Sequence, residues 1–406
     1  MAIGRLIVKV YGSSVADPIF DAKVEILDND LIYYTKEDGS TDAFVLDAPD
    51  IKYSLEPQHE VRPFSTYDIR VSKDDMVTTI VNNVEIFPEE TAIQEVNLVS
   101  SDESNKELVE LDLEDPVLWG DYAPTNYHEN EEMTTPKISP KVLPSVVIPE
   151  YIIVHDGIPS NSSAANYYVS FPDYVKNVAC SEIYSTWPLE SIKANVLAII
   201  SFVLNRIYTE WYPSKGYSFT ITSSTAYDQK YTYGRTLFSS ITTVVDEIFD
   251  NYINFPGRIE PFLAQYRATD ITTGQMSQWG SKDLAMQGYS ALNILKYYYG
   301  NNLVIKQASV TTDLPSSFPG YTLKNGSCGE EVQLIQNQLN KIRGSYPAIP
   351  IITNADGQFN TETYNAVKRF QSVFGLTSDG IVGFATWYKI SYVFTAVSKL
   401  TASITT

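Results

Sequence analysis

The residues that could do chemistry in this chain are few, and the common catalytic patterns are missing. Its three histidines, His59, His128 and His155, are scattered along the sequence. The sequence has no HExxH zinc motif, no GxSxG nucleophile turn and no Walker phosphate loop. Cys180 has no histidine nearby in the sequence to activate it, so a small buried core residue is the better interpretation. Carboxylates are the remaining candidates for acid–base catalysis.

One glutamate shares the apolar face of a predicted helix. Asp173 can cap a helix that runs to about Tyr184, and apolar residues recur along it at helical spacing together with Glu182. A carboxyl group on an apolar face loses hydration, which raises its pKa and favours its neutral form. From spacing alone, however, an ordinary glutamate at the edge of a helix is the favoured interpretation.

The neighbouring elements would have to position this group. A second helix is predicted from Pro188 to about Ile207, with apolar residues around a wide face that indicates burial. Residues 216–235 are rich in Thr, Ser and Tyr, which favours strands and loops, and residues 282–299 are again helical.

Three segments of this region follow one another in a familiar order. They read YVKNVACSEIYSTWPLESIKANVLAIISFVLNRI, AYDQKYTYG and ITTGQMSQWGSKDLAMQGYSALNILKYYYG. Together they resemble the stage II sporulation protein D family. The resemblance implies a lytic transglycosylase that cleaves peptidoglycan glycan strands, with Glu182 as the catalytic acid. The residues that would hold the substrate are Asp228, Gln229, Tyr231, Gln275, Ser277, Gln278 and Trp279.

The same resemblance bears on metals. Some members of the family bind zinc in this region through His and Cys, but residues 216–300 contain neither residue type. We therefore expect no metal and no other cofactor. The histidine that often precedes the family's second signature is also replaced, here by the Thr-Thr-Gly-Gln run that ends at Gln275.

A lytic transglycosylase needs only one carboxyl group, whereas most glycosidases use two. Two alternatives stay open. A muramidase that uses water would need a second carboxylate near Glu182, for which Asp228 and Asp270 are candidates. A spore-wall binding protein without catalytic activity would need no catalytic carboxylate.

The C-terminal part contains NADGQFNTETYNAVKRFQSVFGLTSDGIVGFATWYKI after a helical apolar stripe from Val332 to Ile342. This pattern resembles a peptidoglycan-binding domain with three short helices, over about 70 residues. Its glycines suit turns, and its aliphatic and Phe positions suit a core. The resemblance directs wall binding to the turns and exposed rings, with Asp356, Phe359, Asp379 and Trp387 as candidates.

The net charge of −20 belongs entirely to the first third of the chain. Residues 1–140 hold 30 Asp and Glu against 10 Lys and Arg, and residues 141–406 hold 19 of each. Residues 1–100 alternate like strands, and residues 101–145 read as an acidic linker. We expect a processing site within 137–147, since exposed polar linkers are where proteolysis concentrates.

Residues 1–145 form an acidic leader, which is followed by the catalytic block and the wall-binding block. This order resembles that of the spore cortex-lytic enzymes of anaerobic spore formers. That resemblance implies a zymogen located in the spore, with cortex peptidoglycan as substrate and a subtilisin-like Csp protease as activator. The acidic pI disfavours nucleic acid as a partner. No secretory signal, membrane span or disulfide framework is expected.

The predicted fold class is a multidomain α+β protein. It consists of a β-sandwich-like pro-domain (1–100), the acidic linker (101–145), a mixed α/β catalytic domain (146–312) and a small three-helix wall-binding domain (318–395).

Overall fold

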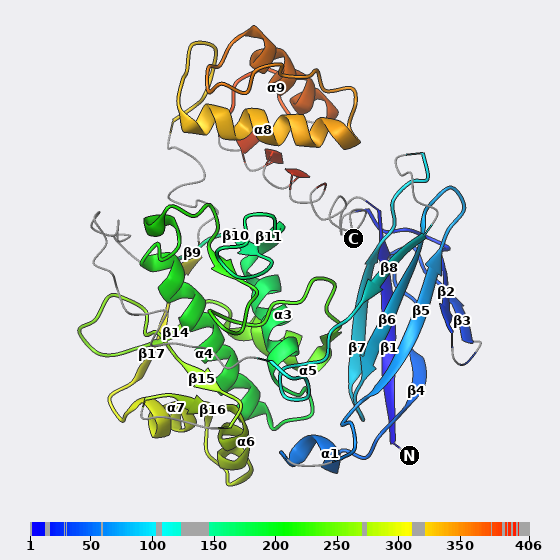
Figure 1. Cartoon of the computed structure of the whole chain (residues 1–406), viewed down its shortest axis with the longest axis vertical. Helices are drawn as coiled ribbons and strands as arrows, with labels where there is room; N and C mark the ends of the chain where they lie inside the picture. The colour runs from blue at the N-terminus through cyan, green and yellow to red at the C-terminus, as the bar shows by residue number, and fades with distance from the viewer. Residues whose placement is uncertain are drawn as a thin grey trace. The chain divides into compact units, whose positions relative to one another are not determined.

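The structure is a computed structural model. It describes residues 2–12, 17–27, 29, 31–57, 60–102, 108–122, 146–269, 274–310, 321–374, 376–383, 386, 387, 389, 390, 393, 394 and 397. The chain forms two compact units, residues 1–310 and residues 311–405 (Figure 1). The protein is multidomain and mixes helices with sheets, as the sequence predicts. The domain boundaries expected inside the first unit stay predictions.

Two β-sheets account for most of the first hundred residues. Their strand orders are β3-β2-β5-β6-β8 and β13-β7-β1-β4. The strands are β1 (Ala2–Tyr11), β2 (Lys23–Ile26), β3 (Leu31–Tyr34), β4 (Phe44–Ala48), β5 (Ser65–Ser72), β6 (Thr78–Ile86), β7 (Thr91–Asn97), β8 (Leu108–Asp112) and β13 (Leu237–Phe238), and a short helix, α1 (Lys52–Leu55), follows β4. Strands β1, β4 and β7 all contact β6 of the other sheet. Leu6, Val8 and Val10 of β1 are fully buried, which agrees with the strand-like alternation predicted for residues 1–100.

Helices dominate the rest of the first unit. They are α3 (Phe171–Glu182), α4 (Leu189–Tyr208), α5 (Ser239–Ile248), α6 (Gln278–Met286) and α7 (Ala291–Tyr299), with the short 3₁₀ helix η1 (Pro213–Lys215). Short strands connect them: β9 (Val147–Ile148), β10 (Tyr151–His155), β11 (Asn166–Ser170), β12 (Ile221–Thr222), β14 (Asn251–Asn254), β15 (Tyr266–Arg267), β16 (Met276–Ser277), β17 (Val304–Gln307) and β18 (Ser309–Val310).

Helix α4 lies at the centre of this region and contacts α3, α5, α6 and α7. Its length and composition would also suit a membrane span, but 89% of its most apolar stretch is buried inside the fold. A helix that is apolar on nearly every side and surrounded by other helices is a core helix.

Two predicted helices begin or end differently in the structure. Helix α3 is capped by Ser170, whose side chain accepts the N–H of Asp173, so Asp173 lies in the first turn and is not the cap. The single helix expected over 282–299 is divided into α6 and α7, because Gly288 adopts a left-handed conformation (φ +88°) that ends α6.

The predicted leader and catalytic block share a sheet. Strand β13 follows the AYDQKYTYG motif, yet it pairs antiparallel with β7 of the leader. Just before β13, Arg235 forms a buried ion pair with Glu85 at 2.6 Å. Gln94 in turn donates to the carbonyl of Gly234 at 2.9 Å. These polar contacts join residues at least 140 positions apart, so no local pattern could predict them.

The C-terminal unit is built around α8 (Glu330–Ser345) and α9 (Thr361–Val373). The predicted stripe from Val332 to Ile342 contributes to its buried core, and so do Val367 and Phe370 of α9. Two glutamines brace the two Asp-Gly turns, because Gln336 accepts the N–H of Gly357 and Gln371 accepts that of Gly380. The third expected helix falls largely outside the described residues.

Candidate active site

Glu182 is the last residue of α3, and only 4% of its surface is exposed. The carbonyl end of a helix carries a partial negative charge, which disfavours a carboxylate there. Burial raises the pKa of Glu182 to about 7, and hydrogen bonds to the charged form oppose that rise. Glu182 is therefore poised between its neutral and ionised forms near neutral pH, as a general acid requires.

Two donors from different parts of the chain hold the Glu182 carboxyl group. The main-chain N–H of Lys230, in the AYDQKYTYG motif, donates to Oε1 at 2.8 Å. The hydroxyl of Tyr266, in β15, donates to Oε2 at 2.6 Å. Across the described residues, no Lys or Arg side chain lies within ion-pair distance (4.0 Å) of this carboxyl group. Its two hydrogen-bond donors are neutral, and the more distant Lys230 ammonium lowers its pKa to a smaller extent.

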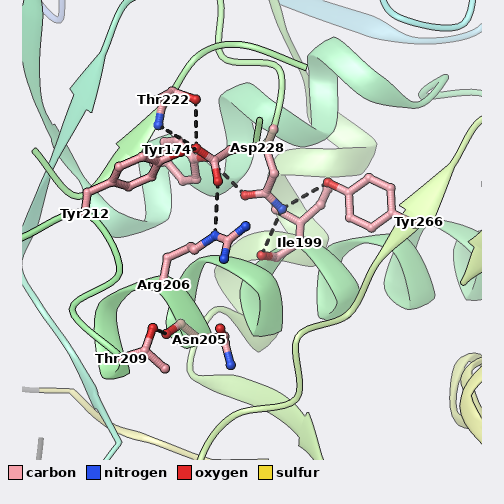
Figure 2. A network of polar contacts seen from close by, with 10 residues as sticks. Tyr174, Ile199, Asn205, Arg206, Thr209, Tyr212, Thr222, Asp228 and Tyr266 are labelled. Atoms are coloured by element: carbon pink, nitrogen blue, oxygen red, sulfur yellow. Dashed lines mark hydrogen bonds and ion pairs between the residues drawn. The ribbon is translucent and has the colours of Figure 1, made fainter. Parts of the chain in front are cut away.

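Gln229 connects Tyr266 to the core. Its side-chain amide donates to the hydroxyl of Tyr266 at 3.0 Å and to the carbonyl of Ile199 at 3.2 Å. Its carbonyl oxygen accepts from the hydroxyl of Tyr174 at 3.0 Å. Figure 2 shows Tyr174, Ile199 and Tyr266, with dashed lines that mark their hydrogen bonds to this amide. Gln229 is 1% exposed, so the structure places it as a bridge behind Glu182.

Asp228, the preceding residue, faces a different set of partners (Figure 2). Its carboxylate is bound by Nε of Arg206 at 3.1 Å, by the hydroxyl of Tyr212, and by the N–H and hydroxyl of Thr222 at 3.1 and 2.7 Å. Asp228 and Arg206 are both almost completely buried. The geometry favours a role for Asp228 in holding the loop that carries Gln229 and Lys230.

The second signature lies beside Tyr266. Strand β15 pairs parallel with β16, so that Tyr266 is opposite Met276 and Arg267 is opposite Ser277. Ser277 caps α6 by accepting the N–H of Gly280 at 3.0 Å. The ring of Trp279 lies 5.9 Å from that of Tyr184, two residues beyond Glu182. The tertiary fold thus brings all three sequence motifs to the end of α3.

All the predicted substrate-contact residues in this region are buried: Asp228, Gln229, Tyr231, Gln275, Ser277, Gln278 and Trp279. Tyr231 stacks on Tyr174 with ring centroids 6.0 Å apart. Their contact with substrate stays a prediction, and for Asp228 and Gln229 the geometry favours support of the site.

In the C-terminal unit, Phe359 and Trp387 are 2% and 1% exposed and belong to its core. Asp356 and Asp379 hold the Asp-Gly turns by accepting the N–H groups of Gln358 and Ile381. Contact of these four residues with the wall also stays a prediction. Their burial favours the interpretation that most of the motif stabilises the domain.

Sequence reasoning did not identify Tyr266, nor the main-chain role of Lys230. Tyr266 lies in FLAQYRATD, outside the three matching segments, and no spacing connects it with Glu182. Asp270, the other candidate for a second carboxylate, lies outside the described residues, as do His59 and His128.

Other reactive side chains of this region have structural surroundings. The ring nitrogens of His155 contact Asn166 and the carbonyl of Ile158, and its ring stacks on Phe219. Cys180 is buried as expected, and burial raises the pKa of its thiol to about 12. No group of three or more His, Cys, Asp or Glu that could hold a metal ion occurs among the residues that the structure describes.

Comparison with known proteins bears mainly on the C-terminal unit. Residues 328–390 match the family "Putative peptidoglycan binding domain". The zinc D-Ala-D-Ala carboxypeptidase of Streptomyces albus G is 45% identical over 69 residues, which is 17% of this chain and 26% of that protein. The N-acetylmuramoyl-L-alanine amidase CwlL of Bacillus licheniformis is 38% identical over 87 residues, 21% of this chain and 23% of that protein.

The chain thus spans about a quarter of the length of these two relatives. Among solved structures, the SleB N-terminal domain is 30% identical; the match covers 19% of this chain and 97% of that one, with a TM-score of 0.17. The family match and the two relatives support a cell-wall-related protein that has peptidoglycan as a partner.

Proposed function

We propose that residues 146–310 form a peptidoglycan lytic transglycosylase domain. We further propose that the whole chain is the zymogen of a spore enzyme similar to the cortex-lytic enzyme SleC. The observation that carries the catalytic proposal is the setting of Glu182: it is buried, it forms no ion pair with a described Lys or Arg, and its pKa is raised to about 7. Such a carboxyl group can both donate and accept a proton near neutral pH.

The reaction needs one group that acts twice. Neutral Glu182 gives its proton to the oxygen that links N-acetylmuramic acid to N-acetylglucosamine, and the bond from that oxygen to C1 of the muramic residue breaks. The resulting carboxylate takes the proton of the muramic C6 hydroxyl, and O6 forms a bond to C1. The product has a 1,6-anhydro end, no water is consumed, and Glu182 recovers its proton.

The described residues favour this reaction over hydrolysis by a muramidase. A muramidase needs a second carboxylate to activate water. The Asp228 carboxylate is already bound by the guanidinium of Arg206 and by three further donors, so it would have to lose those contacts to serve as a base.

The test is the mass of the product ends. The protein, in the form in which it digests purified cortex peptidoglycan, should yield muramic ends that are one water lighter than reducing ends. Reducing ends in their place would overturn the transglycosylase and favour the muramidase. No turnover in any form of the protein would favour a wall-binding protein without catalysis.

The C-terminal unit would tether the catalytic domain to its substrate. The two curated relatives are, by name, a carboxypeptidase and an amidase, whose chemistry differs from glycan cleavage. Their names support a cell-wall enzyme and do not specify its reaction.

Residues 318–395 should sediment with purified peptidoglycan. The full chain without them should bind more weakly, because the effective concentration of the site is lost. Equal binding with and without them would contradict a tethering role.

Contacts of the acidic segment support the zymogen proposal. The N–H of Val117 donates to the carbonyl of Ser181, the residue before Glu182, at 2.8 Å. The carboxylate of Glu114 pairs with Nζ of Lys230, and the ring of Tyr122 lies 4.5 Å from the same nitrogen. The leader thus lies against both segments that meet at the Glu182 carboxyl group, which favours a direct block over a role in folding alone.

The predicted processing region, 137–147, lies mostly outside the described residues. A subtilisin-like Csp protease would cut there, in the spore, during germination. To test the restraint, the full chain is compared on cortex fragments with residues 1–122 and 146–406 produced together as two chains. Equal digestion rates would show that the intact connection does not restrain the enzyme.

A further inference from the structure

The hydroxyl of Tyr266 is the only side-chain donor to Glu182 among the described residues. We propose that Tyr266 is a positioning residue, which orients the Glu182 carboxyl group for both proton transfers, and that Gln229 sets the direction in which Tyr266 donates. This inference rests on the proposed function, because it assigns Tyr266 to the same carboxyl group.

The direction of each hydrogen bond follows from the partners. A main-chain carbonyl can only accept, so the Gln229 atom that faces the carbonyl of Ile199 must be the amide nitrogen. The same nitrogen lies 3.0 Å from the hydroxyl oxygen of Tyr266, which therefore accepts from it. The hydroxyl hydrogen of Tyr266 therefore points at Oε2 of Glu182.

The Gln229 amide is itself held in this orientation. Its carbonyl oxygen accepts from the hydroxyl of Tyr174, and its nitrogen uses its two hydrogens on Ile199 and Tyr266. Tyr174 and Gln229 are both essentially inaccessible to solvent. A rotated amide would place two acceptors together at Ile199, which burial makes costly. The chain Tyr174–Gln229–Tyr266–Glu182 therefore has one direction.

Two donors at two oxygens fix the plane of the carboxyl group. The N–H of Lys230 holds Oε1 and Tyr266 holds Oε2. Each carboxylate oxygen has two lone pairs, so each keeps one free position for the proton that is transferred. Orientation matters for the rate, because displacing a catalytic group by about 1 Å can reduce it about 100-fold.

The hydroxyl also affects the proton affinity of Glu182. The titratable groups that face this carboxyl group are Tyr266, Tyr174 and Lys230; the charge of Lys230, which also pairs with Glu114, lowers the pKa of Glu182. Burial raises the pKa of Glu182 to about 7, and the Tyr266 hydrogen bond is the largest opposing contribution. Removing that donor should therefore raise the pKa further, because the charged form loses a partner that the neutral form needs less.

The experiment compares Tyr266→Phe with Tyr299→Phe. The hydroxyl of Tyr299 donates to the main-chain carbonyl of Gln265 at 2.8 Å, so its removal is the same chemical change one residue away from Tyr266. Both variants are made in the full sequence and assayed on peptidoglycan in the form in which the wild type is active. The readout is the pH dependence of kcat/KM, whose alkaline limb reports the proton on the free enzyme's acid.

We expect Tyr266→Phe to move the alkaline limb to higher pH and to lower kcat by about 10- to 100-fold. Tyr299→Phe should leave the limb in place. A uniform loss of rate with an unmoved limb in Tyr266→Phe, or an equal shift in both variants, would overturn the proposal, since either result indicates a merely structural effect.

A second substitution protects the test against misfolding. Replacing Tyr266 with 3-fluorotyrosine nearly preserves its shape and makes its hydroxyl a stronger donor, so the alkaline limb should move to lower pH. An unmoved limb would contradict the proposal.

Glu182→Gln separates the proposed function from the role of Tyr266. If that variant is inactive while both Tyr266 substitutions leave the limb unchanged, the proposed function stands and the role of Tyr266 fails. If Glu182→Gln is active, the proposed function fails.

Discussion

Two buried carboxylates are close to Gln229 in different ways: Asp228 precedes it in the sequence, and Glu182 is connected to it through Tyr266. Their surroundings are opposite. Asp228 is bound by the guanidinium of Arg206 and by three neutral donors. Glu182 is bound by the Tyr266 hydroxyl and one main-chain N–H, and no described Lys or Arg side chain pairs with it. Both residues are less than 5% exposed.

Burial alone therefore does not identify a catalytic acid. A buried carboxylate bound to a guanidinium can hold the fold together, and its loss leaves the buried cation unpaired. A buried carboxyl group with only neutral donors can keep or release a proton at little difference in free energy near its pKa. Under the proposed function, the contrast supports a structural role for Asp228 and a chemical role for Glu182, and four experiments can break or sharpen this comparison.

The largest effect should come from Glu182→Gln. The amide has the same shape but cannot give and retake a proton, so turnover should fall by at least about 10²- to 10⁴-fold. Initial rates on cortex fragments measure the change, and circular dichroism and binding to peptidoglycan serve as controls. Wild-type rates from a folded variant would remove Glu182 from the mechanism.

Asp228→Asn should act on stability. It leaves the buried guanidinium of Arg206 without its anion, and breaking such a pair typically lowers the free energy of unfolding by about 3–5 kcal/mol. Urea denaturation measures this loss. Molecules that remain folded should keep most of their turnover. A stable but inactive Asp228→Asn protein would mean that Asp228 has a chemical role, as the muramidase alternative requires.

The pH dependence of stability should distinguish Glu182 from ordinary surface glutamates. Its pKa is about 7 in the folded protein against an ordinary value of 4.5 for a glutamate, so the folded state holds the proton more tightly. The stability that this proton contributes is fully present below pH 4.5 and is lost as the pH rises through 7.

Glu182→Gln lacks this loss, so its free energy of unfolding relative to wild type should rise by about 3 kcal/mol between pH 4.5 and pH 8. Glu247→Gln makes the same change at a largely exposed residue and should show no comparable trend. If the free energies of unfolding of the two variants change with pH in parallel, the pKa of Glu182 is not raised in the folded protein.

The smallest effect should come from Glu114→Gln. The Glu114 carboxylate is 58% exposed, and exposed ion pairs typically contribute about 0.2–1 kcal/mol. If the leader restrains the site partly through Lys230, basal digestion by the uncut full chain should rise, by about fivefold at most. Glu110→Gln, at an exposed residue of β8, is the matched control. Equal rates for both variants would show that this ion pair does not contribute to the restraint.

Local patterns in the sequence were sufficient for several features. The alternation of Leu6, Val8 and Val10 indicates a strand, and the apolar stripes through Val332 and Phe370 indicate the helices of the C-terminal unit. These features depend on neighbours two to four residues apart, which is the range over which strand and helix periodicity operates. Charge counting likewise separates the acidic first third from the neutral remainder.

The surroundings of Glu182 depended on the tertiary structure. The sequence places this residue on an apolar helical face, but it does not show that Tyr266, 84 residues away, donates to one oxygen, or that Lys230, 48 residues away, donates to the other. It also does not show that Asp228 has Arg206 as its partner or that β13 completes a sheet of the leader. The composition of a motif restricts which groups can take part, whereas proton affinity depends on desolvation and on donors a few ångströms away. Folding brings those donors together from distant segments.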